Sequence, residues 1–182
     1  KSAKEALKTG ISMVPEDRKQ DGIIADMSVE KNMTLSNLDS YTKAADYVDT
    51  YREKTDVRRY IDLLKIKTTS EDLAIKNLSG GNQQKVVLAK NLLVNPKIII
   101  LDEPTRGVDV GAKYEIYKNI VELAERGISV IMVSSELPEV LGISDRIIVM
   151  HEGEIKGEFI NKDVTQEMIM EAAIVGGRNE SG

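Results

Sequence analysis

The sequence contains no cysteine and no tryptophan, and it has only one phenylalanine, one histidine and four prolines in 182 residues. The absence of cysteine excludes disulfide bonds, zinc–thiolate sites and catalysis by a thiol nucleophile. Because aromatic residues are scarce, the core has to be built from isoleucine, valine, leucine, methionine and alanine. With 41% hydrophobic residues, the chain is still long enough to bury the core of one domain.

Excess positive charge and long apolar runs are lacking as well. The formal net charge is −5, which disfavours electrostatic binding to nucleic acid or to an anionic membrane surface. No segment approaches the ~20 apolar residues that cross a bilayer, and the first residues lack the apolar region of a signal peptide. We therefore expect any membrane span to come from another subunit or segment. The densest basic run is interpreted as a solvated helix face, and it comprises Arg58, Arg59, Lys65 and Lys67.

What the sequence does contain is an alternation of apolar runs and amphipathic segments. Short apolar runs predict strands at residues 11–14, 98–101, 128–134, 146–150 and 155–160. Periodicity and capping residues predict helices at 29–35, 57–65, 86–94, 112–126 and 138–141, with loop or marginal helix at 41–54. This alternation favours an α/β fold with a mostly parallel, buried sheet flanked by helices. Residues 176–182 are expected to be a disordered tail.

Two adjacent carboxylates, Asp102 and Glu103, follow the apolar run 98–101. In open α/β sheets, ligands bind at the C-terminal edge of the parallel strands. Because successive strand residues point to opposite faces, we expect the two carboxylates to do different jobs. In nucleotide hydrolysis, Asp102 would hold Mg²⁺ directly or through water, and Glu103 would orient and polarise the attacking water. The alternative is that both are exposed acids that end a strand.

A glycine-rich loop precedes the helix predicted at 86–94. A hydroxyl, two glycines and a helix start allow backbone N–H groups to approach a phosphate closely. The alternative is a glycine turn followed by an N-cap, because short glycine motifs often occur by chance. The order of loop, helix, paired carboxylates and the later Asp109 favours the phosphate interpretation. The loop, here called the signature loop, comprises Leu78, Ser79, Gly80, Gly81 and Asn82.

The runs LSGGNQQK and LDEPT resemble the signature and Walker B motifs of ABC ATPases, and the resemblance extends over nearly the whole chain. Residues 15–19, 104–113 and 134–139 resemble the second ATPase half of the tandem subunits that drive bacterial monosaccharide import, the pentose importers above all. The resemblance implies the C-terminal portion of a P-loop NTPase-like ABC ATPase domain over residues 1–175. It also implies a small helical subdomain inserted at about residues 23–95.

The resemblance further implies ATP and Mg²⁺ as cofactors and a head-to-tail arrangement with a second ATPase half or subunit. The residues from Ser79 to Asn82 would reach the γ-phosphate bound by the partner, whereas Asp102 and Glu103 would serve the domain's own nucleotide. Asp109 matches the D-loop aspartate that links the two sites.

Membrane partners are implied by the same resemblance, with a peripheral location at the cytoplasmic face of the cell membrane. Transmembrane permease subunits would contact the helices between residues 22 and 64, and a periplasmic sugar-binding protein would act indirectly; no nucleic acid is expected. An exposed apolar dock could include Met27, Met33, Leu35 and Leu38. The alternative is that these residues belong to the core, which is favoured for Met27 and Leu35.

Three departures from the family pattern bear on activity. No G-x-x-x-x-G-K-[ST] motif occurs, and family order places this P-loop before Lys1, so we expect a truncated domain that binds ATP weakly and hydrolyses it negligibly. Glu16 stands where the family usually has the Q-loop glutamine, and Ser135 stands where a switch-loop histidine would contact the γ-phosphate. His151 comes too late in the chain to replace it and is interpreted as a turn residue.

These departures lead to the hypothesis that the domain's own nucleotide site is degenerate, while its signature loop completes a productive site on the partner. The alternative is that Glu16 and Ser135 are tolerated variants and both sites hydrolyse ATP. Two other classes also remain open. One is a non-transport ABC ATPase of the DNA-maintenance or ribosome-associated kind, and the other is a regulatory nucleotide-binding module.

Overall fold

The computed structural model describes residues 2–42 and 47–175, so the tail predicted at 176–182 lies outside the described residues. The chain divides into two compact units, Lys1–Val133 and Ser134–Gly182. The predicted single domain over 1–175 and its inserted helical subdomain stay predictions. Among the described residues, no helix is both long enough and apolar enough to span a membrane.

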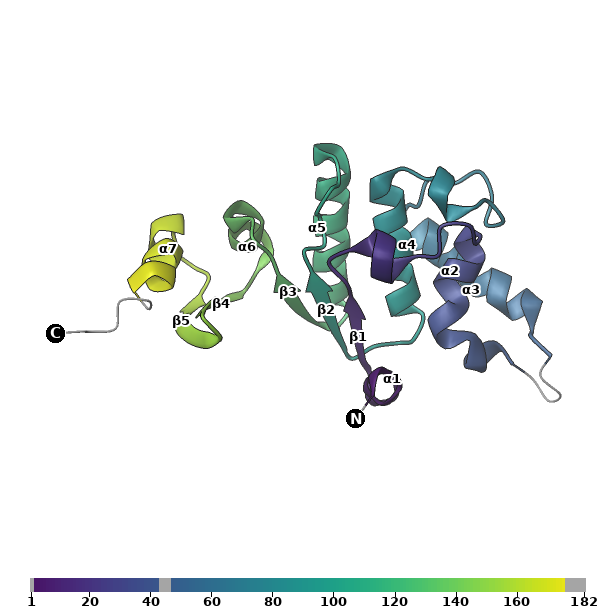
Figure 1. Cartoon of the computed structure of the whole chain (residues 1–182), viewed down its shortest axis with the longest axis horizontal. Coiled ribbons are helices and arrows are strands. Elements are labelled where there is room, and N and C mark those ends of the chain that lie inside the picture. The colour runs from purple at the N-terminus through teal and green to yellow at the C-terminus, as the bar shows by residue number, and fades with distance from the viewer. Residues whose placement is uncertain (1, 43–46, 176–182) are drawn as a thin grey trace. The chain divides into compact units, whose positions relative to one another are not determined.

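A parallel sheet of three strands forms the centre of the first unit (Figure 1). Its strands are β1 (Ile11–Val14), β2 (Ile98–Asp102) and β3 (Ser129–Val133), in the order β1-β2-β3. Val14 lies opposite Leu101, and Asp102 lies opposite Val133, so the C-terminal ends of the three strands meet at one edge. The predicted parallel arrangement is confirmed.

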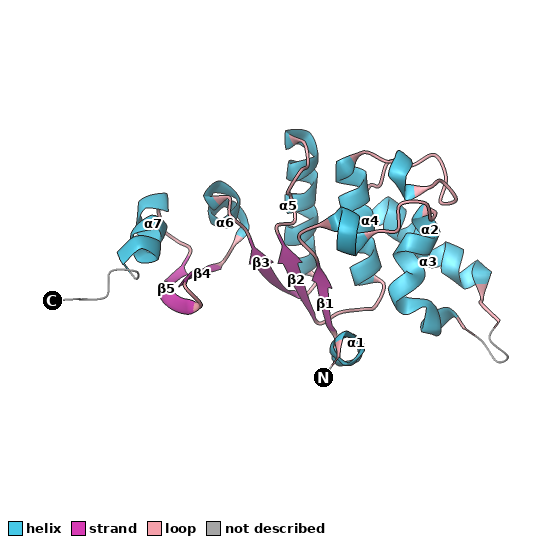
Figure 2. Cartoon of the chain, viewed as in Figure 1, coloured by secondary structure: helices cyan, strands magenta, loops and turns pink. Residues whose placement is uncertain are grey.

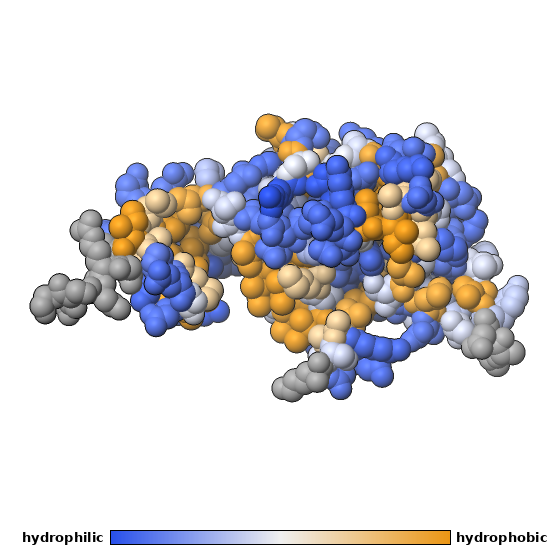
Figure 3. Space-filling model, viewed as in Figure 1, coloured by the Kyte–Doolittle hydropathy of each residue, from blue (hydrophilic) through white to orange (hydrophobic). Residues whose placement is uncertain are grey.

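One face of this sheet is covered by helices α4 (Gly80–Leu92) and α5 (Val110–Glu125), and helix α1 (Ala3–Thr9) packs beside β1. On the covered face, the residues of β1 and β2 are buried and those of β3 are half-buried. The other face exposes hydrophobic side chains, among them Met13, Ile131 and Val133, and Figure 3 shows apolar surface gathered over these strands. The expectation of a fully buried sheet is therefore wrong for this face.

The covered face of the sheet buries aliphatic side chains that alternate along each strand, as a half-covered sheet requires. Ile99 and Leu101 of β2 are buried, together with Val14 of β1. Val14 and Leu101 lie beside Leu88 of α4 and Ile116 of α5. The core of the first unit thus lies between the sheet and α4 and α5.

The remaining helices and helical turns of the first unit gather around α4, with α2 and α3 on the side away from the sheet (Figure 2). They comprise η1 (Arg18–Gly22), α2 (Val29–Thr34), η2 (Leu35–Tyr41), α3 (Thr50–Leu63) and η4 (Ile75–Asn77). The helix predicted to start after Ser28 is confirmed, because the Ser28 hydroxyl accepts the N–H of Lys31 at 3.1 Å.

Helix α3 begins earlier than the predicted start at residue 57, so the segment expected to be loop or marginal helix is helical from Thr50 onward. Asp49 caps the helix by accepting the N–H of Arg52 at 3.1 Å. The polar first turns are helical because Glu53 is buried, where it accepts hydrogen bonds from Lys31 and Thr34. Residues 43–46 of the predicted loop lie outside the described residues.

The second unit consists of a hairpin covered by two helices. It comprises α6 (Leu137–Ile143), β4 (Arg146–His151), β5 (Glu154–Ile160) and α7 (Gln166–Val175), and the two strands are antiparallel. Its small core is centred on Ile147, Val149 and Ile169. Glu152 and Gly153 form the turn between the two strands, and both residues have positive φ. His151, interpreted from the sequence as a turn residue, is the last residue of β4, and α7 was not predicted.

Candidate functional site

The paired carboxylates lie where β2 leaves the sheet, and both are half-buried. The strand ends at Asp102, and Glu103 adopts a left-handed backbone with φ of 44°. Such a conformation costs about 1–3 kcal/mol outside glycine and persists only where surrounding contacts enforce it. Here the Glu103 N–H donates to the carbonyl of Val133 at 2.9 Å, and its carbonyl accepts from Arg106 at 3.1 Å. The strand alternation used to separate the two carboxylates therefore stops at Asp102.

At this edge of the sheet the protein offers a magnesium ion one or two carboxylate ligands and not a complete coordination shell. In the part of the chain that the structure describes, no group of three or more His, Cys, Asp or Glu side chains is placed to hold a metal. Mg²⁺ usually keeps waters and substrate phosphates as ligands and uses only one or two carboxylates. The half-buried Asp102 at the sheet edge fits that donor set.

The signature loop opens α4, and Ser79 occupies the N-cap position without capping the helix by its side chain. Its hydroxyl instead accepts a hydrogen bond from the side-chain amide of Asn82 at 2.9 Å. The oxygen of that same amide accepts the backbone N–H of Lys67 at 2.8 Å. The first N–H groups of α4 are thus left without a side-chain cap and can bind an outside acceptor.

The two glycines of the loop are required by packing as well as by any ligand. A Cβ on Gly81 would lie 2.5 Å from the Cβ of Ala112, at the start of α5. A Cβ on Gly80 would lie 2.8 Å from Nη2 of Arg18 and 3.3 Å from the carbonyl of Gly107. The signature loop is therefore in close contact with the segment that follows the paired carboxylates.

Asp109 begins α5 as its N-cap, and its carboxylate accepts the N–H of Ala112 at 3.0 Å. The preceding Gly107 has φ of +66°, a conformation that glycine adopts without steric cost. Residues 106–109, here called the Asp109 loop, thus connect the paired carboxylates with a capped helix. Its contact with Gly80 brings together motifs that are far apart in the sequence.

Glu16 follows β1 at the same edge of the sheet, and its carboxylate forms an ion pair with Arg106 of the Asp109 loop. Ser135 belongs to the second compact unit and is exposed there. The structure therefore brings together Glu16, the signature loop, the paired carboxylates and Asp109 in the first unit. The catalytic and ligand-binding roles predicted for these residues stay predictions.

Sequence reasoning missed the function-related contacts of Arg18, a residue of the segment 15–19. Its guanidinium donates to the carbonyls of Arg106 at 2.8 Å and Gly107 at 3.2 Å. Gln83 was missed as well, although its buried side chain holds the signature loop by donating to the carbonyls of Ile75 and Leu78, each at 3.2 Å. No local pattern signals such contacts, because each depends on where a distant or preceding carbonyl lies in the fold.

The helices thought to meet membrane partners expose part of the predicted dock. Met27, Leu35 and Leu38 are exposed, together with Ile24, which the sequence analysis did not single out. Met33 is fully buried, so its expected place in the dock is wrong, as is the favoured assignment of Met27 and Leu35 to the core. The basic run expected on a solvated face is exposed at Arg58 and Arg59, which pair with Glu71 and Asp56.

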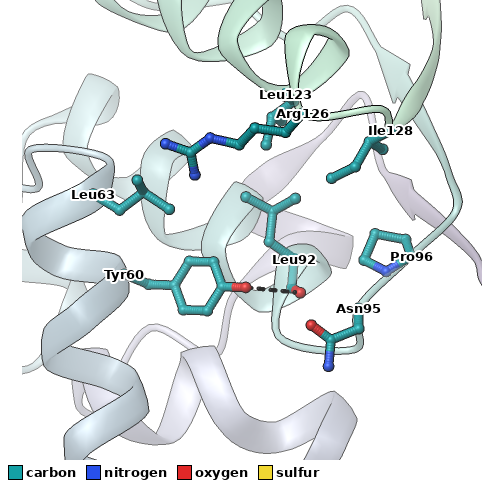
Figure 4. Close-up of a pocket in the computed structure, with 8 residues that line it drawn as sticks. All are labelled: Tyr60, Leu63, Leu92, Asn95, Pro96, Leu123, Arg126 and Ile128. Atoms are coloured by element: carbon teal, nitrogen blue, oxygen red, sulfur yellow. Dashed lines mark hydrogen bonds between the residues drawn. The ribbon is translucent and has the colours of Figure 1, made fainter.

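A pocket of about 230 Å³ lies away from these motifs, where the C-terminal ends of α3, α4 and α5 converge (Figure 4). The Tyr60 hydroxyl donates to the carbonyl of Leu92 at 3.2 Å, and the Arg126 side chain extends toward Leu63 and Tyr60. Helix C-termini carry partial negative charge, which explains the placement of this guanidinium. The pocket contains no residue that the sequence predicted to be functional.

A parallel sheet with carboxylates at the end of β2 and an uncapped, glycine-rich start of α4 defines the class of ABC-type ATPase cassettes. The model of the ABC transporter family matches residues 1–106, and the chain belongs to that family. A dimeric ATP-binding cassette in a post-hydrolysis state with ADP and Pi superposes with a TM-score of 0.72 at 25% identity, covering 88% of this chain and 66% of that one. A nucleotide-free cassette from an ABC transporter superposes at 0.73 with 22% identity, covering 96% and 68%.

Curated relatives are more similar in sequence. The Xylose import ATP-binding protein XylG of Pectobacterium atrosepticum is 58% identical over 95% of this chain. The protein of the same name from Escherichia coli strain K12 is 56% identical over 96% of it. The chain spans 34% of the length of each of these relatives.

Proposed function

We propose that this chain is part of the ATP-hydrolysing subunit of a bacterial importer of xylose or a closely similar monosaccharide. The high identity to xylose import ATP-binding proteins over nearly the whole chain supports the transport assignment. The observation that carries the ATPase assignment is the uncapped start of α4, packed through Gly80 against the loop that follows Asp102 and Glu103. The 182-residue chain alone has no P-loop motif to grip the phosphates, so activity belongs to the full-length protein.

The proposed work is divided between two nucleotide sites. Asp102 would hold Mg²⁺ and Glu103 would position the attacking water at the domain's own site. The N–H groups at the start of α4 would bind the γ-phosphate of ATP held by a partner cassette, since a helix N-terminus favours negative charge. Asp109 would link the two nucleotide sites, because the Asp109 loop contacts both the signature loop and the segment of the paired carboxylates.

The domain's own site is proposed to hydrolyse ATP poorly. Glu16 cannot donate a hydrogen bond as glutamine does, and its carboxylate is engaged with Arg106. A serine at position 135 lacks the reach and the titration of imidazole, which weakens stabilisation of the transition state. The signature loop keeps all of its residues and would complete the productive site of the partner.

The apolar surface formed by Ile24, Met27, Leu35 and Leu38 is proposed to contact the permease subunits at the cytoplasmic face of the membrane. These side chains are exposed on the segments around α2, although hydrophobic residues of this size are usually buried. Closure of two cassettes around ATP would move this surface and the permeases with it. A periplasmic sugar-binding protein would then deliver the sugar to the permeases.

The division of labour is tested by ATPase assays on the full-length protein assembled with its permeases. Ser79→Arg places a large side chain at the start of α4 and should abolish turnover, whereas Glu103→Gln should leave much of it. Thr69→Arg, which adds the same side chain at an exposed position, serves as the control and should be active. An equal collapse for Glu103→Gln would show that both sites hydrolyse ATP and would contradict the degenerate site.

The transport assignment is tested by purifying the full-length protein from cells with its natural partners. Co-purification of permease subunits supports the importer. Co-purification of ribosomes or DNA, without permeases, would overturn it in favour of a non-transport ABC ATPase.

A further inference from the structure

Arg18 joins three segments that the proposed mechanism assigns to different tasks. It follows Glu16 by two positions, and its guanidinium donates to the carbonyls of Arg106 at 2.8 Å and Gly107 at 3.2 Å. The planar fork of arginine suits two neighbouring oxygen acceptors, which a lysine cannot bind in the same geometry. The Asp109 loop is thereby held by its backbone, independently of the side chains it carries.

The base of Arg18 is itself anchored. Asp17 accepts the N–H groups of Lys19 at 2.8 Å and Gln20 at 3.1 Å, which caps the turn η1. At the other end of η1, the carbonyl of Gly22 accepts a hydrogen bond from Lys90 of α4 at 3.1 Å. The guanidinium therefore extends from a turn that is fixed to α4, the helix that begins with the signature loop.

The third segment is the signature loop itself. Nη2 of Arg18 lies so close to Gly80 that any Cβ at this position would approach it to 2.8 Å. Nε of the same side chain is buried and has no hydrogen-bond partner among the described residues. Leaving a buried donor unpaired costs free energy. The Arg18 side chain nevertheless adopts this position, in which its guanidinium lies beside both loops.

We propose that Arg18 is a positioning residue that holds the signature loop and the Asp109 loop as one rigid group, so that the two nucleotide sites they serve respond together. This inference rests on the proposed ATPase function. Glu16 reinforces the group from the same segment through its ion pair with Arg106. Movement of the Asp109 loop alone would break the hydrogen bonds of Arg18, and movement of the signature loop alone would separate Gly80 from the guanidinium.

The experiment compares Arg18→Met, Arg18→Lys and Lys19→Met in the full-length protein assembled with its permeases. Lys19→Met is the matched control, because it removes one positive charge from the neighbouring exposed residue of η1. Arg18→Met should lower kcat about tenfold, because the two loops would no longer move together, with the KM for ATP changed less than about twofold. Arg18→Lys should give an intermediate kcat, since its ammonium can reach one of the two carbonyls.

Hydrogen–deuterium exchange distinguishes the proposed role of Arg18 from a structural role confined to η1. Arg18→Met should speed exchange in both residues 79–82 and residues 106–109, whereas Lys19→Met should leave both unchanged. If Arg18→Met affects only η1, or if its kcat equals that of Lys19→Met, the positioning role is wrong. A wild-type protein without ATPase activity would instead overturn the proposed function, which separates the two failures.

A second variant, Gly80→Ala, tests the inference by itself if Arg18→Met is poorly folded, and the double variant tests it further if Arg18→Met folds. Gly80→Ala should displace the Arg18 guanidinium. Hydrogen–deuterium exchange should then rise in the Asp109 loop, although Gly80 is not part of that loop. Combining Gly80→Ala with Arg18→Met should add little to either single change, because both remove the same contacts. Fully additive effects would contradict the inference.

Discussion

Lys85 of α4 and Glu115 of α5 form an ion pair in which only the carboxylate meets solvent. Nζ of Lys85 lies 2.5 Å from Oε2 of Glu115 and donates a second hydrogen bond to the carbonyl of Lys65 at 3.0 Å. The Lys85 side chain is 2% exposed and that of Glu115 is 41% exposed. The hydrogen bond from Lys85 is the main cause that lowers the pKa of Glu115 below its usual value. The pair thus ties the helix of the signature loop to the helix capped by Asp109.

The unequal burial of this pair predicts unequal effects of removing its members. Glu115→Ala leaves a buried ammonium with one carbonyl partner and should lower the free energy of unfolding by about 1–3 kcal/mol. Lys85→Met should cost less, because methionine fills the buried space and the exposed carboxylate can be hydrated. Urea unfolding followed by circular dichroism measures both losses. A larger loss for Lys85→Met would contradict this account.

The same pair predicts a pH dependence of stability. Folding lowers the pKa of Glu115 from its usual 4.5, so the pair stabilises the folded state above that pH. This contribution is lost as the pH falls through the lower pKa of the folded state. Glu115→Gln should therefore flatten the decline of stability below about pH 4.5, which urea unfolding at a series of pH values records. In a Lys85→Met background, the same change should have little effect on the slope, and an undiminished effect there would refute the assignment.

The close approach of Gly81 to Ala112 predicts a steric penalty at the signature loop. Gly81→Ala would place its Cβ 2.5 Å from that of Ala112 and should destabilise the fold by about 1–3 kcal/mol. Gly111→Ala is the control, since its Cβ would meet only Oδ1 of Asp109, at 3.4 Å. The double variant Gly81→Ala, Ala112→Gly should be more stable than the sum of the two single losses, as urea unfolding can show. Strict additivity would mean that the two positions do not clash.

Much of the secondary structure followed from local patterns. The apolar run before Asp102 and the serine before Val29 predicted a strand and a helix start that the structure confirms. Helix α3 was placed too late because its first turns are polar, and only the burial of Glu53 against Lys31 and Thr34 explains why they are helical. Such burial depends on tertiary contacts, which periodicity does not encode.

The candidate site was predictable to a similar extent. Ser79, Gly80, Asp102 and Glu103 were selected by residue type and spacing, and the structure places them in one compact unit. The left-handed backbone of Glu103 was not predictable, because it depends on a hydrogen bond to Val133 in a neighbouring strand.

The sequence by itself determined the class of fold, the ABC-type motifs and the order of the strands, since each depends on neighbouring residue types and short spacings. Only the tertiary structure decided which motifs touch. Arg18 meets the carbonyls of Arg106 and Gly107 across 88 and 89 positions of the chain. It also decided that Met33 is buried while the equally apolar Met27 is exposed, because Met33 lies in α2, which packs against α3 and α4, whereas Met27 precedes that helix. Contacts between distant segments arise from packing in three dimensions, which no local pattern of residues specifies.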